Sequence, residues 1–328
     1  MENNGEIFLS RGWASIAGAI ALALWAAEST IVMYLGEIPP LQLIAIVGGI
    51  GFLATLARVA FTNRWHTLRQ PPKIWLVGIV SFTLVQACYA SAFQYAPPAG
   101  VDMIYYLWPI EVIILSNIVI GERFTRSHIF ASMIAMVGMT LLFMDIIGSD
   151  SIAWEYNHII GYVLAFIASL AWTAYTLFTR RYSNLSSSMM GGYMGVSALV
   201  TAIGHFLFEK TVVPTSEQWM LMVFYGISLV GIAYLLWDYG LKRGHYQTLN
   251  VLSYMVPMGA LTFLVLTGLT EPTTYLLCAC ACITLAALCT LAAEGSKAYK
   301  KRKTVKQKKM QERQESSSIL EPIAMESA

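Results

Sequence analysis

Residues 39–61 read PPLQLIAIVGGIGFLATLARVAF, an apolar run that contains one charged side chain, Arg58. A helix of about 20 such residues is long enough to cross the hydrocarbon core of a membrane, which is roughly 30 Å thick. Lipid offers no partner for backbone N–H and C=O groups, so a run of this length predicts a membrane-spanning helix. Similar runs recur along the chain.

The composition agrees with a membrane environment. Hydrophobic residues make up 57% of the 328 residues and charged residues 12%. Soluble domains have about half apolar and a quarter charged residues, so an ordinary soluble protein is excluded. The predicted fold class is therefore all-α, an integral membrane bundle.

Ten such runs are separated by short connections, several of them marked by Pro or Gly. The predicted helices cover residues 12–34, 39–61, 74–95, 98–119, 126–147, 158–179, 187–208, 217–240, 246–267 and 271–293. A basic, Ser-rich tail over residues 295–328 follows and is predicted to be disordered or partly helical.

The basic residues predict the orientation, because Lys and Arg favour short cytoplasmic loops. With the N-terminus inside, twenty of the 21 Lys and Arg residues fall on the cytoplasmic side, and only Lys210 falls outside. Dropping one helix would invert every later loop, so this distribution supports the helix count as well. We expect a multi-pass protein of a bacterial inner membrane with both termini in the cytoplasm.

The two halves of the chain look like copies. An offset of 147 residues aligns Trp25 with Trp172, and an offset of 148 aligns Tyr106 with Tyr254 and Pro109 with Pro257. Because five is odd, consecutive five-helix copies must sit in opposite orientations in the membrane. This inverted-repeat plan is typical of secondary transporters, whose binding site lies between the repeats. We predict a first repeat over 1–150 and a second over 151–294.

At this point the residues resemble a known family. The stretches AFQYA (92–96), YYLWP (105–109) and GER (121–123), and in the second half WDYGL (237–241) and LSYMVP (252–257), are similar to two EamA-type units of the drug/metabolite transporter superfamily. The YYLWP run is similar to YddG-type aromatic amino acid exporters. The second copy has Thr270-Glu271 in place of the Gly-Glu pair. The resemblance implies a ten-helix carrier that exports aromatic and some other hydrophobic amino acids, with organic cations as a further class.

Three carboxylates lie within the predicted helices, namely Glu28, Glu111 and Asp238. A carboxylate in the membrane is costly and usually faces a water-filled path or a partner. Each also has a structural interpretation, as a group hydrogen-bonded inside the bundle or, for Asp238, one at the headgroup level. His205 in the seventh helix is expected to lie near the external end and to be hydrated.

Helical spacing places aromatic residues beside these carboxylates, on faces that predict one central cavity. The candidate substrate-binding residues are Trp25, Glu28, Gln86, Tyr89, Phe93, Tyr105, Trp108, Glu111, Trp172, Tyr175, Tyr234 and Trp237. Packing between helices or a belt at the membrane surface is the alternative for each aromatic residue. Pro109 and Pro257 are predicted to kink their helices, as a rocking mechanism would need.

These residues suit a small organic solute better than a reaction. Aromatic walls would bind an apolar side chain, and no Arg or Lys is expected mid-membrane to hold a carboxylate. We find no His-Glu-x-x-His, Gly-x-Ser-x-Gly or phosphate-loop motif, so an enzyme is disfavoured. A drug or metabolite carrier of the same fold, or uptake of the same solutes, remains the alternative.

No metal or other cofactor is expected. The five cysteines, Cys88, Cys278, Cys280, Cys282 and Cys289, lie in apolar runs without His or acidic ligands nearby, and we interpret them as packing residues. The expected partners are the transported solute and membrane lipid, with no nucleic acid. A weak homodimer remains open.

Overall fold

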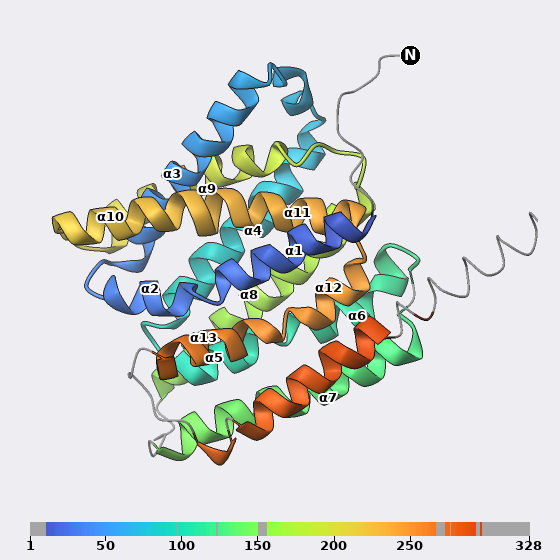
Figure 1. Cartoon of the computed structure of the whole chain (residues 1–328). Coiled ribbons are helices and arrows are strands. Elements are labelled where there is room, and N and C mark those ends of the chain that lie inside the picture. The colour runs from blue at the N-terminus through green and yellow to red at the C-terminus, as the bar shows by residue number, and fades with distance from the viewer. Residues whose placement is uncertain are drawn as a thin grey trace, which may run out of the picture.

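The computed structural model describes residues 11–96, 98–122, 124–149, 156–266, 273–275, 277–292 and 296, and these residues form helices and turns without a strand (Figure 1). The labelled helices are α1 (Arg11–Trp25), α2 (Glu28–Tyr34), α3 (Pro40–Phe61), the short 3-10 helix η1 (Trp65–Leu68), α4 (Pro72–Ala92), α5 (Pro98–Tyr105), α6 (Trp108–Val119), α7 (Arg126–Ser149), α8 (Tyr156–Arg181), α9 (Met189–Phe208), α10 (Ser216–Phe224), the π-helical η2 (Tyr225–Ile232), α11 (Ala233–Arg243), α12 (Tyr246–Leu252) and α13 (Met255–Leu266). A further apolar helix covers Leu277–Ala292.

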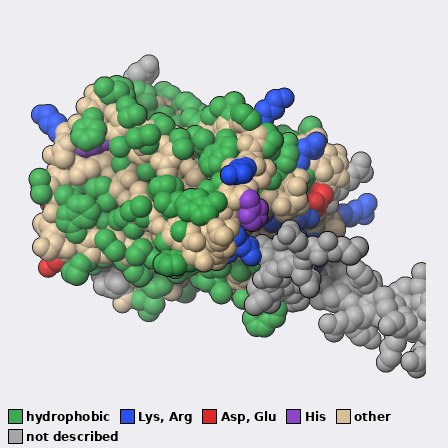
Figure 2. All heavy atoms as spheres, turned by 90° about the horizontal axis from the view of Figure 1, so that it is seen from above, with side chains coloured by type: hydrophobic (Ala, Val, Ile, Leu, Met, Phe, Trp, Pro, Cys, Tyr) green, Lys and Arg blue, Asp and Glu red, His purple; other side chains and the backbone are tan. Residues whose placement is uncertain are grey.

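Length and composition allow several of these helices to cross a membrane. Among the described residues, six spans qualify: Arg11–Val32, Pro40–Phe61, Pro72–Ala92, His158–Arg181, Met189–Phe208 and Ser216–Arg243. Trp108–Val119 and Leu277–Ala292 are shorter apolar helices. Figure 2 shows hydrophobic side chains spread over one face of the molecule, with most Lys and Arg side chains toward its ends. An exterior of this kind suits lipid rather than water.

Two of the predicted helices are interrupted rather than continuous. The helix expected over 98–119 is divided into α5 and α6, and the helix expected over 246–267 into α12 and α13. Pro109 and Pro257 have no N–H to pair with the carbonyl groups four residues earlier, those of Tyr105 and Ser253. Both interruptions lie just before the proline, so the helix does not merely bend there but restarts.

The helix expected over 12–34 is also interrupted, between α1 and α2, although neither Pro nor Gly lies at the break. Tertiary contacts flank it on both sides. The Trp25 indole donates to the Leu229 carbonyl at 3.1 Å, and Glu28 accepts a hydrogen bond from the Tyr225 hydroxyl. Both partners belong to η2, a π-helical stretch inside the helix expected over 217–240. The sequence pattern predicts neither irregularity.

The other predicted helices agree with the structure within a few residues. The last predicted helix is described over 277–292. Residues 267–272, which include Glu271, lie outside the described residues. Apart from residue 296, the basic tail also lies outside them. Gly121, which ends the α6 turn, has a φ of 71°, a backbone conformation that favours glycine.

Helix packing brings distant segments together. In Figure 1, α1 lies beside α11, and α7 beside Leu277–Ala292. The α1 and α11 backbones touch where Gly18 meets Gly240, because a side-chain carbon on Gly240 would come within 2.9 Å of the Gly18 Cα atom. Small residues permit this close approach of two helices in a membrane protein.

His205 is buried and paired, which corrects the expectation that it is hydrated. It is 3% exposed, and its ring nitrogens lie 2.9 Å from Glu209 and 2.9 Å from Thr211. Glu209 also accepts from the backbone N–H groups of Leu41 and Gln42, at 3.0 and 3.1 Å, at the start of α3. The first N–H groups of a helix have no partner within it, so this carboxylate gives α3 an N-terminal cap.

Candidate functional site

Four tryptophans meet in the interior of the bundle, each from a different helix. Trp25 of α1, Trp108 of α6 and Trp237 of α11 surround Trp172 of α8, with ring centroids 5.9, 6.1 and 6.4 Å from it. Trp237 is fully buried, and Trp108 and Trp172 are nearly so. Trp25 is half-buried, so the group is packed into the bundle and is not a belt on its exterior.

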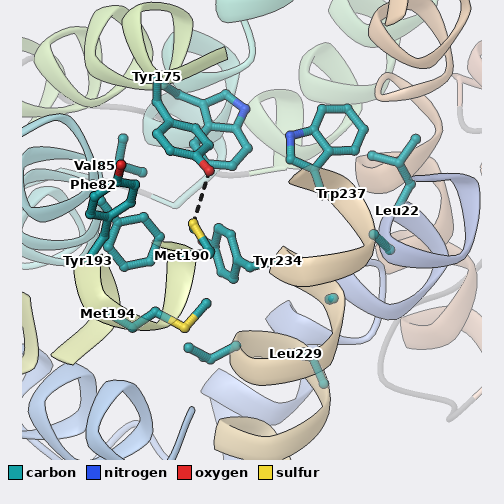
Figure 3. Close-up of a cluster of buried hydrophobic side chains, with 14 of the residues drawn as sticks. Leu22, Phe82, Val85, Tyr175, Met190, Tyr193, Met194, Leu229, Tyr234 and Trp237 are labelled. Carbon is teal, nitrogen blue, oxygen red and sulfur yellow. Dashed lines mark hydrogen bonds between the residues drawn. The ribbon is translucent and has the colours of Figure 1, made fainter. Parts of the chain in front are cut away.

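Two tyrosines and a glutamine extend the same group. Tyr234 packs against Trp25 at 4.9 Å, and its hydroxyl donates to the Gln86 side chain at 3.2 Å. Tyr175 stacks on Trp172 at 5.4 Å. Figure 3 shows these two tyrosines and Phe82, whose ring centroid is 6.4 Å from that of Tyr175 and 5.1 Å from that of Tyr234. We call Trp25, Gln86, Trp108, Trp172, Tyr175, Tyr234 and Trp237 the central aromatic cluster.

The rings of the central aromatic cluster pack directly against one another between the helices. Trp172 and Trp237 are stacked with an interplanar angle of 17°, whereas Trp108 meets both of them edge-on at 86° and 88°. Stacked and edge-to-face contacts are both favourable for aromatic rings. These contacts hold the cluster together, while Trp25 and Gln86 keep part of their side-chain surface exposed.

A second aromatic group lies on α4 and α5. Tyr89 is 4.9 Å from Phe93 and 4.2 Å from Tyr105, and its hydroxyl donates to the Asp102 carboxylate. Tyr105 packs against the hydrophobic core that contains the central aromatic cluster. The two groups therefore belong to one continuous interior.

Each predicted carboxylate in α2 and α6 has polar partners on another helix. Glu111 accepts from Ser169 and from Thr173 of α8, both at 2.8 Å, and the Thr173 hydroxyl also lies 3.2 Å from the Trp108 carbonyl. Glu28 pairs with Tyr225 as described above. These bonds give both carboxylates hydrogen-bond donors, and Thr173 connects Glu111 to the Trp108 backbone.

Asp238 and Lys242 form an ion pair inside the protein, 2.6 Å apart on successive turns of α11. This position corrects one sequence interpretation. Lys242, predicted to lie in a cytoplasmic loop, belongs to α11 and has a buried side chain. Asp238 also accepts from the Tyr175 hydroxyl at 3.1 Å, which connects the pair to the central aromatic cluster.

Arg180 joins several elements at the same end of the bundle. Its guanidinium pairs with Glu122 at 2.9 Å, donates to the Leu241 and Lys242 carbonyls at 3.3 Å, and lies 4.9 Å from the centre of the Tyr246 ring. Glu122 follows α6, whereas the other partners belong to α11 and α12. One side chain thus ties together helices from the two halves of the chain.

Sequence reasoning missed several residues of this interior. Asp102 lies four residues into its predicted helix, yet it is three residues before Tyr105, and the 148-residue offset pairs it with Asn250. Asn250 is buried, and its amide donates to the Pro109 carbonyl at 2.8 Å. The repeat was thus a signal for both. No spacing pointed to Tyr225, which begins the π-helical stretch that the sequence pattern does not predict.

The sequence matches the EamA-like transporter family twice, over residues 12–144 and over residues 159–292. The chain belongs to the EamA-like transporter family. The two matched segments contain the whole central aromatic cluster, with Trp25, Gln86 and Trp108 in the first and the other four residues in the second. The family is one of membrane transporters, so this is a multi-pass membrane protein. The central aromatic cluster therefore lies in the interior of a transporter fold.

Individual relatives agree with the family. The chain is 33% identical over 279 residues to the aromatic amino acid exporter YddG of Ancylobacter novellus, covering 84% of this chain and 96% of the exporter. The biotin transporter of Escherichia coli strain K12 is 22% identical over 225 residues, covering 66% of this chain and 73% of that protein. A solved crystal structure matches with a TM-score of 0.79 at 30% identity, covering 86% of this chain and 98% of the other.

Proposed function

We propose that this protein is a secondary carrier that exports aromatic and other hydrophobic amino acids across a bacterial inner membrane. One observation carries the proposal: Trp25, Trp108, Trp172 and Trp237 meet from both halves of the chain in the interior of a transporter-family fold. Buried indoles can bind an apolar or aromatic side chain by contact area. The similarity to the YddG exporter points to the same substrate class.

The same residues that fill the interior are proposed to line the substrate path. Tyr234, Gln86 and Tyr105 offer polar groups among the rings, and Glu28 and Glu111 offer negative charge for a substrate ammonium. Tyr89, Phe93 and Tyr175 extend the aromatic wall. A site built mainly from rings would recognise the size of a side chain more than its polar groups.

We propose that the five-helix units over 1–150 and 151–294 are inverted copies related by a two-fold axis through the central aromatic cluster. Residues exchanged by such an axis can touch each other only near the axis itself. Two repeat-related pairs do touch: Trp25 with Trp172, and Gln86 with Tyr234. In the repeat, α8 is the counterpart of α1, and α4 is the counterpart of α11. The axis would therefore exchange the α1–α11 contact with the α8–α4 contact, and both contacts are present.

Transport is proposed to proceed by alternating access, in which the two units separate first on one side of the cluster and then on the other. The packed rings and the Arg180 network would hold one end shut. The interruptions before Pro109 and Pro257 would let α6 and α13 move relative to α5 and α12, since no continuous hydrogen-bond ladder crosses them.

Direct transport tests the proposed function. Proteoliposomes loaded with unlabelled phenylalanine are expected to accumulate labelled phenylalanine several-fold above protein-free liposomes, by exchange. A second run with an imposed pH gradient separates proton coupling from facilitated diffusion. A carrier of the same fold for another solute is the second candidate, supported by the biotin transporter relatives. Exchange of labelled biotin without exchange of phenylalanine, tyrosine or tryptophan would favour it.

Both termini are proposed to face the cytoplasm, because twenty of 21 Lys and Arg residues then lie on that side. A periplasm-dependent phosphatase fused after Ala328 should be inactive, and the same phosphatase inserted at Lys210, between α9 and α10, should be active. The reverse pattern would contradict the orientation.

A further inference from the structure

The Asp238–Lys242 pair is a buried feature that the central aromatic cluster does not explain. The Lys242 ammonium lies 2.6 Å from the Asp238 carboxylate, and the two side chains are 6% and 4% exposed. Removing two charges from water costs more than their attraction usually returns, so a buried pair is weak support for stability. Charges within membrane segments are more often part of a substrate path.

The pair lines a narrow recess among aromatic side chains, with about 10 Å³ of free space in this conformation, so an aromatic solute could enter only as the surrounding side chains move apart. The residues around it are Phe178, Thr179, Tyr182, Leu185, Met189, Tyr193, Asp238 and Lys242. Three aromatic rings and a thioether face the two opposite charges. The recess lies where α8 and α11 end in Arg180, Arg181 and Arg243, which is the end of the bundle predicted to face the cytoplasm.

Tyr175 links this recess to the central aromatic cluster. Its hydroxyl donates to the Asp238 carboxylate at 3.1 Å, while its ring stacks on Trp172 at 5.4 Å. The Tyr175 hydroxyl also lies 2.9 Å from the Met190 sulfur atom, and this is the hydrogen bond drawn in Figure 3. A solute in the recess would therefore be one side chain away from the tryptophans.

We propose that Asp238 and Lys242 form a binding site for the head group of a free α-amino acid, at the cytoplasmic entrance of the transport path. The inference rests on the proposed function and names the chemical feature that the substrate must carry. Asp238 would hold the α-ammonium group and Lys242 the α-carboxylate, while the substrate side chain packs on Phe178, Tyr182 and Tyr193. One ion pair within the protein is exchanged for two with the solute.

This exchange selects solutes that carry both charges. An amine without a carboxylate would take Asp238 from Lys242 and leave a buried ammonium unpaired. An acid without an amine would leave Asp238 unpaired. A site with buried polar groups rejects a ligand that fails to pair them, because each unpaired group keeps its full desolvation cost. The protein would thus recognise the size of the substrate side chain at the tryptophans and the charged head group at the Asp238–Lys242 pair.

Competition against labelled phenylalanine exchange tests the inference with three probes: L-phenylalanine, 2-phenylethylamine and 3-phenylpropionate. In the unmodified protein, phenylalanine should compete at least about tenfold better than either single-charged probe, as expected for the loss of a charged hydrogen bond. Lys242→Met should lose the preference over phenylethylamine, and Asp238→Asn the preference over phenylpropionate.

The double variant Asp238→Asn/Lys242→Met leaves no lone buried charge, so it guards against misfolding of the single variants. Its preference for phenylalanine over both probes should fall to about threefold or less. Arg243→Met, an exposed cation on the next residue, is the matched control and should keep the preference. A folded double variant that retains the tenfold preference would overturn the inference and leave the pair a structural one.

Failure of the proposed function would look different. If the unmodified protein exchanges no aromatic amino acid, the same probes, together with L-leucine and L-alanine, are tested for thermal stabilisation of the purified protein. Stabilisation by amino acids but not by the single-charged probes, lost in the double variant, would support the head-group site alone. Equal or absent stabilisation by all of them would overturn it.

Discussion

Replacing Trp172 by alanine should lower the preference of the transporter for tryptophan and phenylalanine over alanine by about tenfold, as measured by transport competition. The Trp172 ring contacts Trp25, Trp108, Tyr175, Tyr234 and Trp237, more rings than any other member of the central aromatic cluster. Contacts of this kind are worth on the order of 1 kcal/mol each beyond buried area, and about 1.4 kcal/mol is a factor of ten in affinity. Bulky substrates should suffer most because they use the most wall area.

The controls separate recognition from folding. A buried Trp→Ala change costs about 3–5 kcal/mol of stability, so expression and thermal unfolding of the variant must be measured first. Trp172→Phe keeps a ring and should restore part of the preference. Trp219→Ala makes the same change on an exposed position of α10 and should leave the preference intact. Unchanged discrimination in both Trp172→Ala and Trp108→Ala would assign these tryptophans to helix packing alone.

Glu28→Gln and Glu111→Gln should give the second largest effect. If one of these carboxylates carries the coupling proton, its replacement should lower gradient-driven export at least about tenfold. Each change keeps the shape of the side chain and its capacity to accept a hydrogen bond, from Tyr225 or from Ser169 and Thr173. A glutamine cannot release a proton. Net transport driven by a pH gradient should therefore fall, while exchange of phenylalanine, which moves no net proton, continues.

The second role proposed for these carboxylates, holding the substrate ammonium, predicts another pattern. Loss of that contact would weaken exchange and gradient-driven export together, by a similar factor. Glu217→Gln, on an exposed position of α10, is the matched control and should change neither. Normal export by both variants between pH 6 and 8 would show that neither Glu28 nor Glu111 has either role. Asp102→Asn would then be the next variant, because Asp102 is the half-buried carboxylate bonded to Tyr89.

Much of the bundle follows from local pattern, and this explains which parts could be predicted. Apolar runs of fixed length define where helices begin and end, because the membrane imposes the same thickness on each of them. Helical spacing put Trp108 and Glu111 on one face of one helix, and the 147-residue repeat made Trp25 and Trp172 equivalent positions. The structure brings these tryptophans together in the interior, whereas their role in substrate binding stays a prediction.

The irregular parts depend on contacts between helices, and the pattern of one helix does not contain them. The break after Trp25 has no Pro or Gly beside it, and its flanking side chains bond to the π-helical stretch of another segment. Lys242 could be assigned to a loop from its place at a helix end. Asp238 and Lys242 are four residues apart, so they become neighbours once α11 extends to Arg243, and the packing of α11 against other helices buries the pair.

The sequence alone thus determined that the chain is a helical membrane protein built from two similar halves, and which residues could face its interior. Tertiary structure alone decided that the rings pack on one another, that Asp102 pairs with Tyr89, and that the Asp238–Lys242 pair is buried beside an aromatic recess. The reason is physical: hydrophobicity and spacing fix the length and faces of each helix, whereas its rotation, its breaks and its partners are set by contacts with helices far away in the sequence.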